Sequence, residues 1–317
     1  MRPTPGIAAV PLLLIATLVP GSVASAGTDR QLPRNGRIAY SVGAILPDPD
    51  THAHSQVFTI RPDGSGRRQL THVTAPVQAG DPNYSPTGRR IAYVSNATGR
   101  FQVWVMSAAG AHQHRLVVDP RRSAFLPRWA PDGRHIAFTR CNEPFGFVEC
   151  SIATVRADGT HLHVITRGHW LNFDARYAPD SRSILYSSSR GGLSSAIWKA
   201  RPDGSGAHRL TRPEPEAFWP DFTPDGRRIL FTNNFERPNS NLVTMRPDGT
   251  HLRRVTNVKP PRQAGFGSYS PDGRRIVFDS ARLRGREGVG VMNADGTHVR
   301  MIVQTGNLTI ADWGVAR

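Results

Sequence analysis

A short phrase recurs five times along this chain, and it constrains the fold more than any other feature. Each copy holds an aromatic residue, a turn of the Ser-Pro-Asp-Gly type and an apolar stretch whose isoleucine follows the aromatic residue by seven positions. The copies begin at Tyr84, Trp129, Tyr177, Phe222 and Tyr269; a truncated copy opens at Asn35, and a last aromatic residue, Trp313, stands near the end. A spacing held through five copies, with a period of about 45 residues, identifies a repeat protein.

A second phrase, built around an Asp-Gly type of turn, alternates with the first. Its turn glycines are Gly64, Gly110, Gly159, Gly204, Gly249 and Gly296, and an aliphatic residue follows each by six positions. Proline presets φ, aspartate hydrogen-bonds nearby amides and glycine adopts positive φ, so both phrases are tight turns. Two residues after the glycine, four copies have histidine where the other two have glycine: His112, His161, His251 and His298 against Gly66 and Gly206. We expect these histidines to serve the turn, and we predict no metal site.

The stretch after each Ser-Pro-Asp-Gly turn alternates with period two and is apolar on both sides. Ile91 and Tyr93 face one way, and Ala92 and Val94 face the other. A strand of this kind must be covered on both faces, which a propeller achieves by stacking each sheet between two neighbours. Third strands are expected at 56–60, 102–106, 196–200 and 241–245, and a fourth at positions such as 67–71. The sequence therefore predicts an all-β propeller of four-stranded antiparallel blades.

The number of repeats predicts how the ring closes. Six leading aromatic residues and six Asp-Gly-type turns make six blades. The chain begins with a second-strand phrase at 37–41 and ends with a first-strand phrase at 310–315. The C-terminal strand is therefore expected to complete the N-terminal blade, which removes an open sheet edge.

These two phrases resemble the WD40-like β-propeller repeat of TolB and of related periplasmic proteins. The resemblance covers residues 32–315. It implies a TolB-like propeller, but without the α/β domain that precedes the propeller in TolB and without the segment by which TolB engages its inner-membrane partner. A propeller of this kind implies a surface that can bind a partner, although a fold alone does not identify an activity.

The first 26 residues have the pattern of a signal peptide. Arg2 supplies the positive charge, 7–19 is a short apolar run, and 24–26 reads Ala-Ser-Ala. A run of 13 residues is short for the roughly 30 Å core of a bilayer, although a retained anchor stays an alternative. We predict cleavage after residue 26, a single domain over 27–317, and a periplasmic, cell-envelope or extracellular location with no membrane span after cleavage.

Two cysteines fit the predicted export. Cys141 and Cys150 lie on either side of a short loop between two expected strands. A hairpin would place them opposite each other, and an oxidising compartment would let them form a disulfide. The alternative, a reactive thiol or a metal pair, has no further cysteine to complete a site.

The chain is strongly basic, with a formal net charge of +16. Nearly all of this charge comes from arginine, since Lys199 and Lys259 are the only lysines. A GC-rich coding sequence produces such a bias, and so does selection for binding an anionic envelope polymer. The arginines recur at turn positions and do not form one block with aromatic residues, so specific nucleic-acid binding is not expected.

The candidate site is the channel mouth. The loops at the end opposite the repeated turns vary in length and content, and binding residues concentrate on such loops. Residues one and three positions before each leading aromatic are expected to share one side of the innermost strand and to face the channel. This selects Asp81, Arg128, Asp174, Arg176, Trp219, Asp221 and Asp312. The alternative is a water-filled channel lined by charges that neutralise one another.

No catalytic motif is recognisable, and no cofactor is expected. The sequence therefore favours an exported, monomeric, non-catalytic propeller that binds a protein or an envelope polymer. The alternative hypothesis is an enzyme of the lyase or hydrolase type that acts on a carbohydrate or another small polar substrate at the channel mouth.

Overall fold

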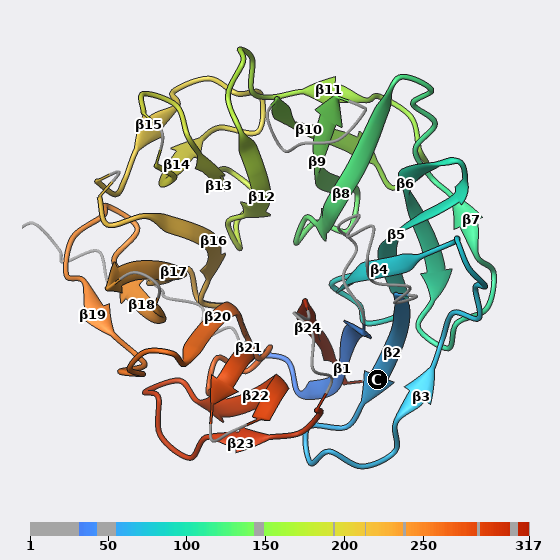
Figure 1. The fold of residues 1–317 in the computed structure, drawn as a ribbon. Helices are drawn as coiled ribbons and strands as arrows, with labels where there is room; N and C mark the ends of the chain where they lie inside the picture. The colour runs from blue at the N-terminus through green and yellow to red at the C-terminus, as the bar shows by residue number, and fades with distance from the viewer. Residues whose placement is uncertain are drawn as a thin grey trace, which may run out of the picture. The chain divides into compact units, whose positions relative to one another are not determined.

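Six four-stranded antiparallel sheets are arranged as a ring around a common centre in the computed structural model, as Figure 1 shows. The structure describes residues 32–42, 55–142, 149–192, 194–212, 214–236, 239–283, 286–304 and 310–316. The prediction of a signal peptide at 1–26 lies outside these residues. In the described part of the chain, no helix is long and apolar enough to cross a membrane. The predicted six-bladed all-β propeller is confirmed.

In each blade the strands follow one another from the centre of the ring outwards. Blades 1 to 3 are β24 (Ala311–Val315), β1 (Asn35–Val42), β2 (Gln56–Ile60), β3 (Arg68–Gln69); β4 (Ala79–Tyr84), β5 (Arg90–Thr98), β6 (Arg100–Ser107), β7 (His114–Arg115); and β8 (Arg122–Trp129), β9 (His135–Asn142), β10 (Cys150–Arg156), β11 (His163–Val164). Blades 4 to 6 are β12 (Asn172–Tyr177), β13 (Ile184–Ser188), β14 (Ala196–Ala200), β15 (His208–Arg209); β16 (Ala217–Phe222), β17 (Ile229–Glu236), β18 (Asn239–Met245), β19 (Arg253–Arg254); and β20 (Gln263–Tyr269), β21 (Arg275–Leu283), β22 (Arg286–Asn293), β23 (Arg300–Met301).

The C-terminal strand closes the ring as predicted. β24 pairs antiparallel with β1, with Trp313 opposite Ile38 and Val315 opposite Asn35. Blade 1 is thus built from both ends of the ring-forming chain, and β1 has no open edge toward the channel. Figure 1 shows β24 beside β1 at the inner end of that blade.

The two apolar sides of each second strand pack into different interfaces between blades. Ile91 belongs to the core that blade 2 shares with blade 1, whereas its neighbour Ala92 belongs to the core shared with blade 3. The same division separates Ile276, which faces blade 5, from Val277, which faces blade 1. Six such cores lie between the blades, so burial on both faces explains why the stretch is apolar throughout.

The histidines that exchange with glycine adopt the conformation that glycine favours. His112, His161, His251 and His298 have φ between 55° and 58°, close to the 63° and 65° of Gly66 and Gly206. The turn requires the left-handed region at this position, which costs a residue with a side chain roughly 1 kcal/mol. Their role in the turn is confirmed.

The outermost strands are shorter than predicted, because a side chain replaces part of the ladder. The Leu-Thr stretch around Leu70 is not a full strand, and β3 has two residues. The backbone amide of Leu70 still donates to the carbonyl of Val57, and the Thr71 hydroxyl accepts from the amide of Val57 at 2.9 Å. Blades 3, 4 and 5 repeat this hydroxyl contact through Thr166, Thr211 and Thr256. The threonine recurs because it satisfies a backbone donor.

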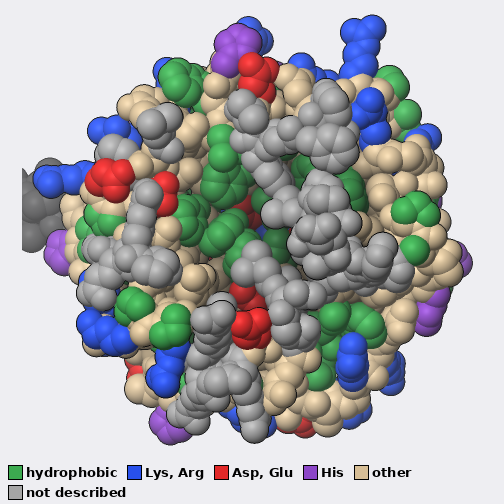
Figure 2. Space-filling view, in the orientation of Figure 1, with side chains coloured by type: hydrophobic (Ala, Val, Ile, Leu, Met, Phe, Trp, Pro, Cys, Tyr) green, Lys and Arg blue, Asp and Glu red, His purple; other side chains and the backbone are tan. Residues whose placement is uncertain are grey.

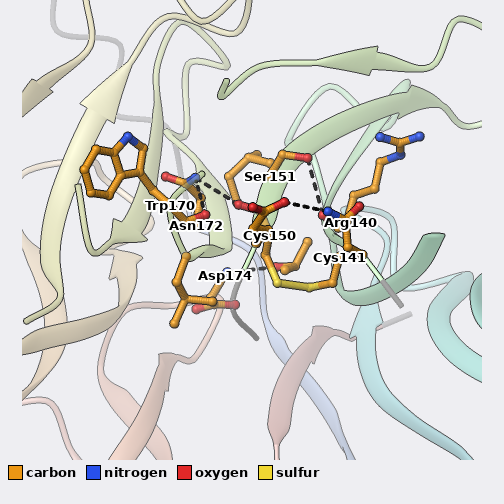
Figure 3. Close-up of a disulfide and its surroundings, with 12 residues drawn as sticks. Arg140, Cys141, Cys150, Ser151, Trp170, Asn172 and Asp174 are labelled. Atoms are coloured by element: carbon orange, nitrogen blue, oxygen red, sulfur yellow. Dashed lines mark hydrogen bonds between the residues drawn. A yellow bond between two sulfur atoms is a disulfide. The ribbon is translucent and has the colours of Figure 1, made fainter. Parts of the chain in front are cut away.

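The two cysteines form the expected disulfide. Cys141 on β9 lies directly opposite Cys150 on β10, with their Cα atoms 4.1 Å apart, and both are buried. Figure 3 shows that the bond lies next to blade 4. The Cys150 carbonyl accepts a hydrogen bond from the Asn172 side chain at 2.9 Å, and its amide donates to the carbonyl of Trp170. The disulfide therefore also holds the segment that enters β12.

Candidate functional site

Five of the six innermost strands contain a bulge at the same place. In blades 2 to 6, the pairing between the first and second strands shifts by one residue just before the leading aromatic. The bulged residues are Asp81, Leu126, Asp174, Trp219 and Phe266, whose φ lies between 48° and 55°. None of them is glycine, so the surroundings must hold the backbone in this conformation.

Hydroxyl groups of the preceding blade stabilise most of these bulges. The bulged amides of blades 4, 5 and 6 donate to Thr139, Ser187 and Thr232 at 3.1 to 3.2 Å. Blade 2 has Val94 at the equivalent position, and there the carboxylate of Asp81 accepts the amide of Leu126 at 3.1 Å. These hydroxyl contacts were not predicted from the sequence. Their signal is a serine or threonine three residues after the repeat isoleucine.

In blades 1, 2 and 5, a polar residue just before the leading aromatic joins the blade to the next one. Asp312 accepts the amide of Tyr84 at 2.8 Å, Asn83 that of Trp129 at 2.7 Å, and Asp221 that of Tyr269 at 3.0 Å. In each case one side-chain oxygen has a structural role. For the two aspartates, the other oxygen lies near the guanidinium group of Arg176.

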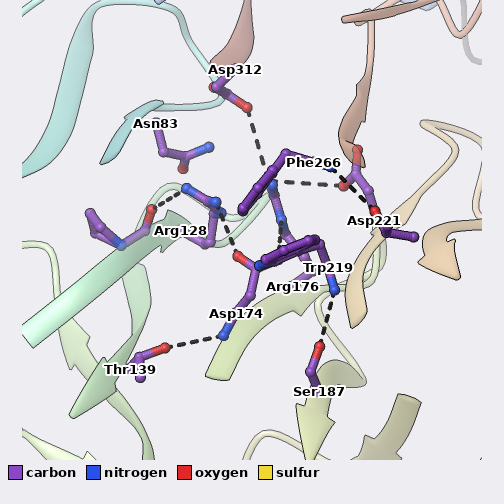
Figure 4. Close-up of polar contacts among 12 residues, drawn as sticks. Asn83, Arg128, Thr139, Asp174, Arg176, Ser187, Trp219, Asp221, Phe266 and Asp312 are labelled. Carbon is purple, nitrogen blue, oxygen red and sulfur yellow. Dashed lines mark hydrogen bonds and ion pairs between the residues drawn. The ribbon is translucent and has the colours of Figure 1, made fainter. Parts of the chain in front are cut away.

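Blades 3 and 4 have arginine at this position, and their guanidinium groups pair with carboxylates instead. Arg128 pairs with Asp174 at 3.0 Å. Arg176 lies 3.9 Å from Asp174, 4.0 Å from Asp221 and 3.9 Å from Asp312, the last of which belongs to blade 1 on the opposite side of the ring. Figure 4 shows the guanidinium of Arg176 among the three carboxylates. Arg176 therefore bridges the channel at this level.

Burial divides the charged residues into two layers. Asp81, Arg128 and Asp174 are at most 3% exposed, so they support the site from beneath. The side chains of Arg176, Asp221 and Asp312 keep 10 to 15% exposure. These three are the charged groups that a molecule in the channel can contact directly.

Burial also shifts the pKa values of carboxyl groups in this cluster. It raises the pKa of Asp81 to about 6, although Arg128 and the amide of Leu126 oppose the shift. Burial likewise raises the pKa of Asp221 and of Asp312, against the opposing charge of Arg176. Burial acts to lower the pKa of Arg176, but the attraction of the surrounding carboxylates outweighs it and leaves that pKa raised. With all six groups charged, four carboxylates face two guanidinium groups, and the channel carries a net charge of −2.

The raised pKa of Asp81 makes folding stability depend on pH. The folded protein holds the proton more tightly than the unfolded chain, whose carboxyl titrates near 3.8. The tighter binding of this proton stabilises the folded protein by about 2 to 3 kcal/mol. This contribution is fully present below a pH of about 3.8 and is lost as the pH rises through about 6. We expect the free energy of unfolding to fall between about pH 4 and 7. Asp81→Asn, whose amide oxygen can still accept the Leu126 amide, should flatten this slope in urea titrations; an unchanged slope would contradict the assignment.

Aromatic rings form the lip above the charged cluster. Trp219 stacks on Phe266 with ring centroids 3.5 Å apart, Phe218 meets Trp219 edge-on at 4.6 Å, and Phe173 lies 6.5 Å from it. These rings come from blades 4, 5 and 6. In Figure 2, hydrophobic side chains surround a central hollow with acidic side chains among them. The site thus consists of an aromatic lip above the charged cluster, which we also call the floor of the site.

The structure brings the seven predicted residues into one region. Six of them make up the charged cluster, and Trp219 lies in the lip. Figure 4 labels all of them except Asp81. The bulge interrupts the regular alternation of the strand, so alternation alone does not explain why these side chains come together. The aromatic neighbours Phe173, Phe218 and Phe266 were not selected, although their adjacency to the predicted positions was visible in the sequence.

Comparison with known proteins agrees with the architecture. The TolB from Acinetobacter baumannii superposes with a TM-score of 0.72 and 21% identity, over 89% of this chain and 68% of that chain. The putative TolB from Agrobacterium tumefaciens gives 0.65 and 19%, over 89% of this chain and 99% of the other. The uncharacterised peptidase YuxL of Bacillus subtilis is 30% identical over 114 residues, which are 35% of this chain and 17% of the peptidase. The chain spans less than a fifth of the curated relatives it matches. The TolB β-propeller domain profile matches residues 35–316, and the chain belongs to that family.

Proposed function

We propose that this protein is an exported, non-catalytic propeller that binds a protein partner at the channel mouth. The observation that carries the proposal is the aromatic lip over the bridging guanidinium of Arg176. The proposal includes a monomeric protein with one domain over residues 27–317.

The lip has the composition of a protein-binding hot spot. Tryptophan and arginine dominate the energetics of protein interfaces, especially where their surroundings exclude water. Trp219 is partly exposed, while the backbone bulge and the ring of Phe266 fix its position. A side chain held in place before binding loses little conformational freedom on association, which favours affinity.

The floor favours a partner with a positively charged side chain. The cluster carries two more carboxylates than guanidinium groups, and Asp221 and Asp312 keep part of their surface open. A lysine or arginine that enters past the aromatic lip would offset this excess of negative charge. Its aliphatic stem would contact the rings, as such side chains commonly do.

Two features support export. The pattern of Arg2, the apolar run at 7–19 and the small residues at 24–26 is that of a cleaved signal peptide. The disulfide between Cys141 and Cys150 suits an oxidising compartment. We propose a periplasmic, cell-envelope or extracellular location on these grounds.

The test compares two truncations on opposite faces. Trp219→Ala removes the centre of the lip, and Leu252→Ala removes a 55% exposed side chain on the opposite, turn-bearing face. The partner is identified by cross-linking in intact cells, and its affinity for each purified variant is then measured. We expect Trp219→Ala to weaken binding by about 30-fold or more, as for a hot-spot residue, and Leu252→Ala by less than about twofold. Equal affinities of the partner for both variants would show that it does not bind at the channel mouth.

An enzyme acting on a carbohydrate is the second candidate. It rests on Asp221, a partly exposed carboxyl group with a raised pKa in the same strand as Trp219. Aromatic rings beside such a carboxyl group can hold a sugar while the carboxyl group exchanges a proton. A screen on anionic oligosaccharides tests it: turnover that disappears in Asp221→Asn would favour the enzyme, and no turnover by the wild-type protein would count against it.

A further inference from the structure

The face opposite the channel mouth carries a surface that the proposed function does not use. It consists of the turns between first and second strands and the turns between third and fourth strands, with the start of the outer strands. We call it the turn face, made of residues 85–90, 130–135, 178–183, 223–228, 270–275, 61–69, 107–115, 156–163, 201–209, 246–254 and 293–300. We propose that the turn face binds a linear polymer of phosphate groups.

These segments form one continuous surface. In an antiparallel four-stranded meander, the first and third connections lie at the same end of the sheet. Neighbouring blades also touch there: a Cβ at Gly226 would lie 3.6 Å from Pro179, and one at Gly273 would lie 3.5 Å from Pro224. Arg300 of blade 6 donates to the backbone carbonyl of Asp63 in blade 1 at 3.2 Å. A polymer can therefore follow the turns from blade to blade.

Positive charge is concentrated on this surface. The turn face contains 19 arginines, nine aspartates and no glutamate or lysine, a net charge of +10 over 82 residues. The other 174 described residues contain 16 arginines and lysines and 11 acidic residues, a net charge of +5. A bias in the coding sequence alone would enrich arginine throughout the chain, whereas the rest of the described chain, its buried strands included, carries half the net charge of the turn face. The unequal distribution points to a function of this face.

The aspartates of the turn face are committed to the turns themselves. Each of the nine accepts a backbone amide two residues further along, as Asp132 does from Arg134 at 2.7 Å and Asp203 from Ser205 at 2.9 Å. Turn geometry accounts for their positions. It does not require arginine beside them, and 18 of the 19 arginines are exposed.

The kind of charge indicates the ligand. The guanidinium group matches a phosphate with two parallel hydrogen bonds, which a compact ammonium cannot do. The arginines repeat around six blades and do not converge on one point, so they suit a ligand whose charges also repeat. A flexible chain can follow a ring of turns, whereas a stiff duplex cannot bend this sharply without a large cost.

Two variants with the same change in net charge test the proposal. The first replaces Arg227, Arg246, Arg253 and Arg274, all exposed on the turn face, by glutamine. The control replaces four other arginines by glutamine: Arg121, Arg167, Arg212 and Arg262. These side chains are exposed on the mouth side, in the connections that lead into the innermost strands. The probe is long-chain inorganic polyphosphate, and the dissociation constant is measured as a function of salt concentration.

We expect the wild-type protein to bind polyphosphate with an affinity that falls steeply with salt. The turn-face variant should bind polyphosphate at least about tenfold more weakly than the wild-type protein. Because four phosphate contacts are removed, the magnitude of its slope of log K against log salt concentration should be smaller by about three. The control variant should stay within about threefold of wild type. Equal losses in both variants would show that net charge alone drives binding and would overturn the proposal. Equal affinity for polyglutamate or for duplex DNA would overturn the assignment to a flexible phosphate polymer.

Discussion

Removal of residues 310–317 is expected to abolish cooperative folding. This deletion takes away β24, the innermost strand of blade 1, and with it the buried ring of Trp313. Loss of a buried tryptophan side chain alone costs about 3 to 5 kcal/mol, against a total stability of about 5 to 15 kcal/mol for a typical domain. The deletion also breaks the ladder with β1 and the contact between Asp312 and the Tyr84 amide.

The control restores the strand at a different place in the sequence. Val315 lies opposite Asn35, and the Ala316 amide donates to the carbonyl of Arg34 at 2.8 Å, so the two chain ends of blade 1 are adjacent. A chain in which 310–316 precedes residue 32 through a short glycine-serine linker should regain the sigmoidal urea transition of the wild-type protein. A deletion variant that unfolds within about 1 kcal/mol of wild type would show that ring closure contributes little.

The fold was predictable because every blade has to meet the same requirements. The Ser-Pro-Asp-Gly turns and the second-strand stretches beginning at Ile91 or Ile276 recur since each sheet needs a tight turn and burial on both faces. Ring closure followed from the same pattern, because the chain begins with one half of a blade and ends with the other. The register of Cys141 opposite Cys150 followed from the expected hairpin.

The site was predictable only as a set of positions. Counting back from the leading aromatic located Arg176 and Asp312, but their approach across the channel depends on how six blades are placed around the ring. The bulge at Trp219 was not visible, because it needs a positive φ at a residue with a side chain. The hydroxyl that supports it, Ser187, lies 32 residues earlier in a different blade. Contacts of this range are set by the tertiary structure and not by local sequence preference.

Replacement of Arg128 by methionine is the second large effect that we expect. Arg128 and Asp174 form a buried pair with their charged atoms 3.0 Å apart, and both side chains are at most 3% exposed. Methionine would leave the carboxylate of Asp174 buried without its closest positive charge. Breaking a buried ion pair in this way costs about 3 to 5 kcal/mol. Arg227→Met provides the matched control, because Arg227 is 86% exposed, lies 3.9 Å from Asp225, and should contribute less than about 1 kcal/mol.

Two further measurements separate the loss of charge from the loss of packing. If the uncompensated carboxylate is the cause, the double variant Arg128→Met/Asp174→Asn should regain most of the lost stability, because neither charge remains buried alone. As the pH falls, the single variant should also gain more stability than the wild-type protein does, since the carboxyl groups left without Arg128 gain more from protonation in the folded protein than in the unfolded chain. A double variant as unstable as the single one, with no such pH dependence, would mean that the stem of Arg128 acts through its packing. The ion pair would then have no measurable part in holding blades 3 and 4 together.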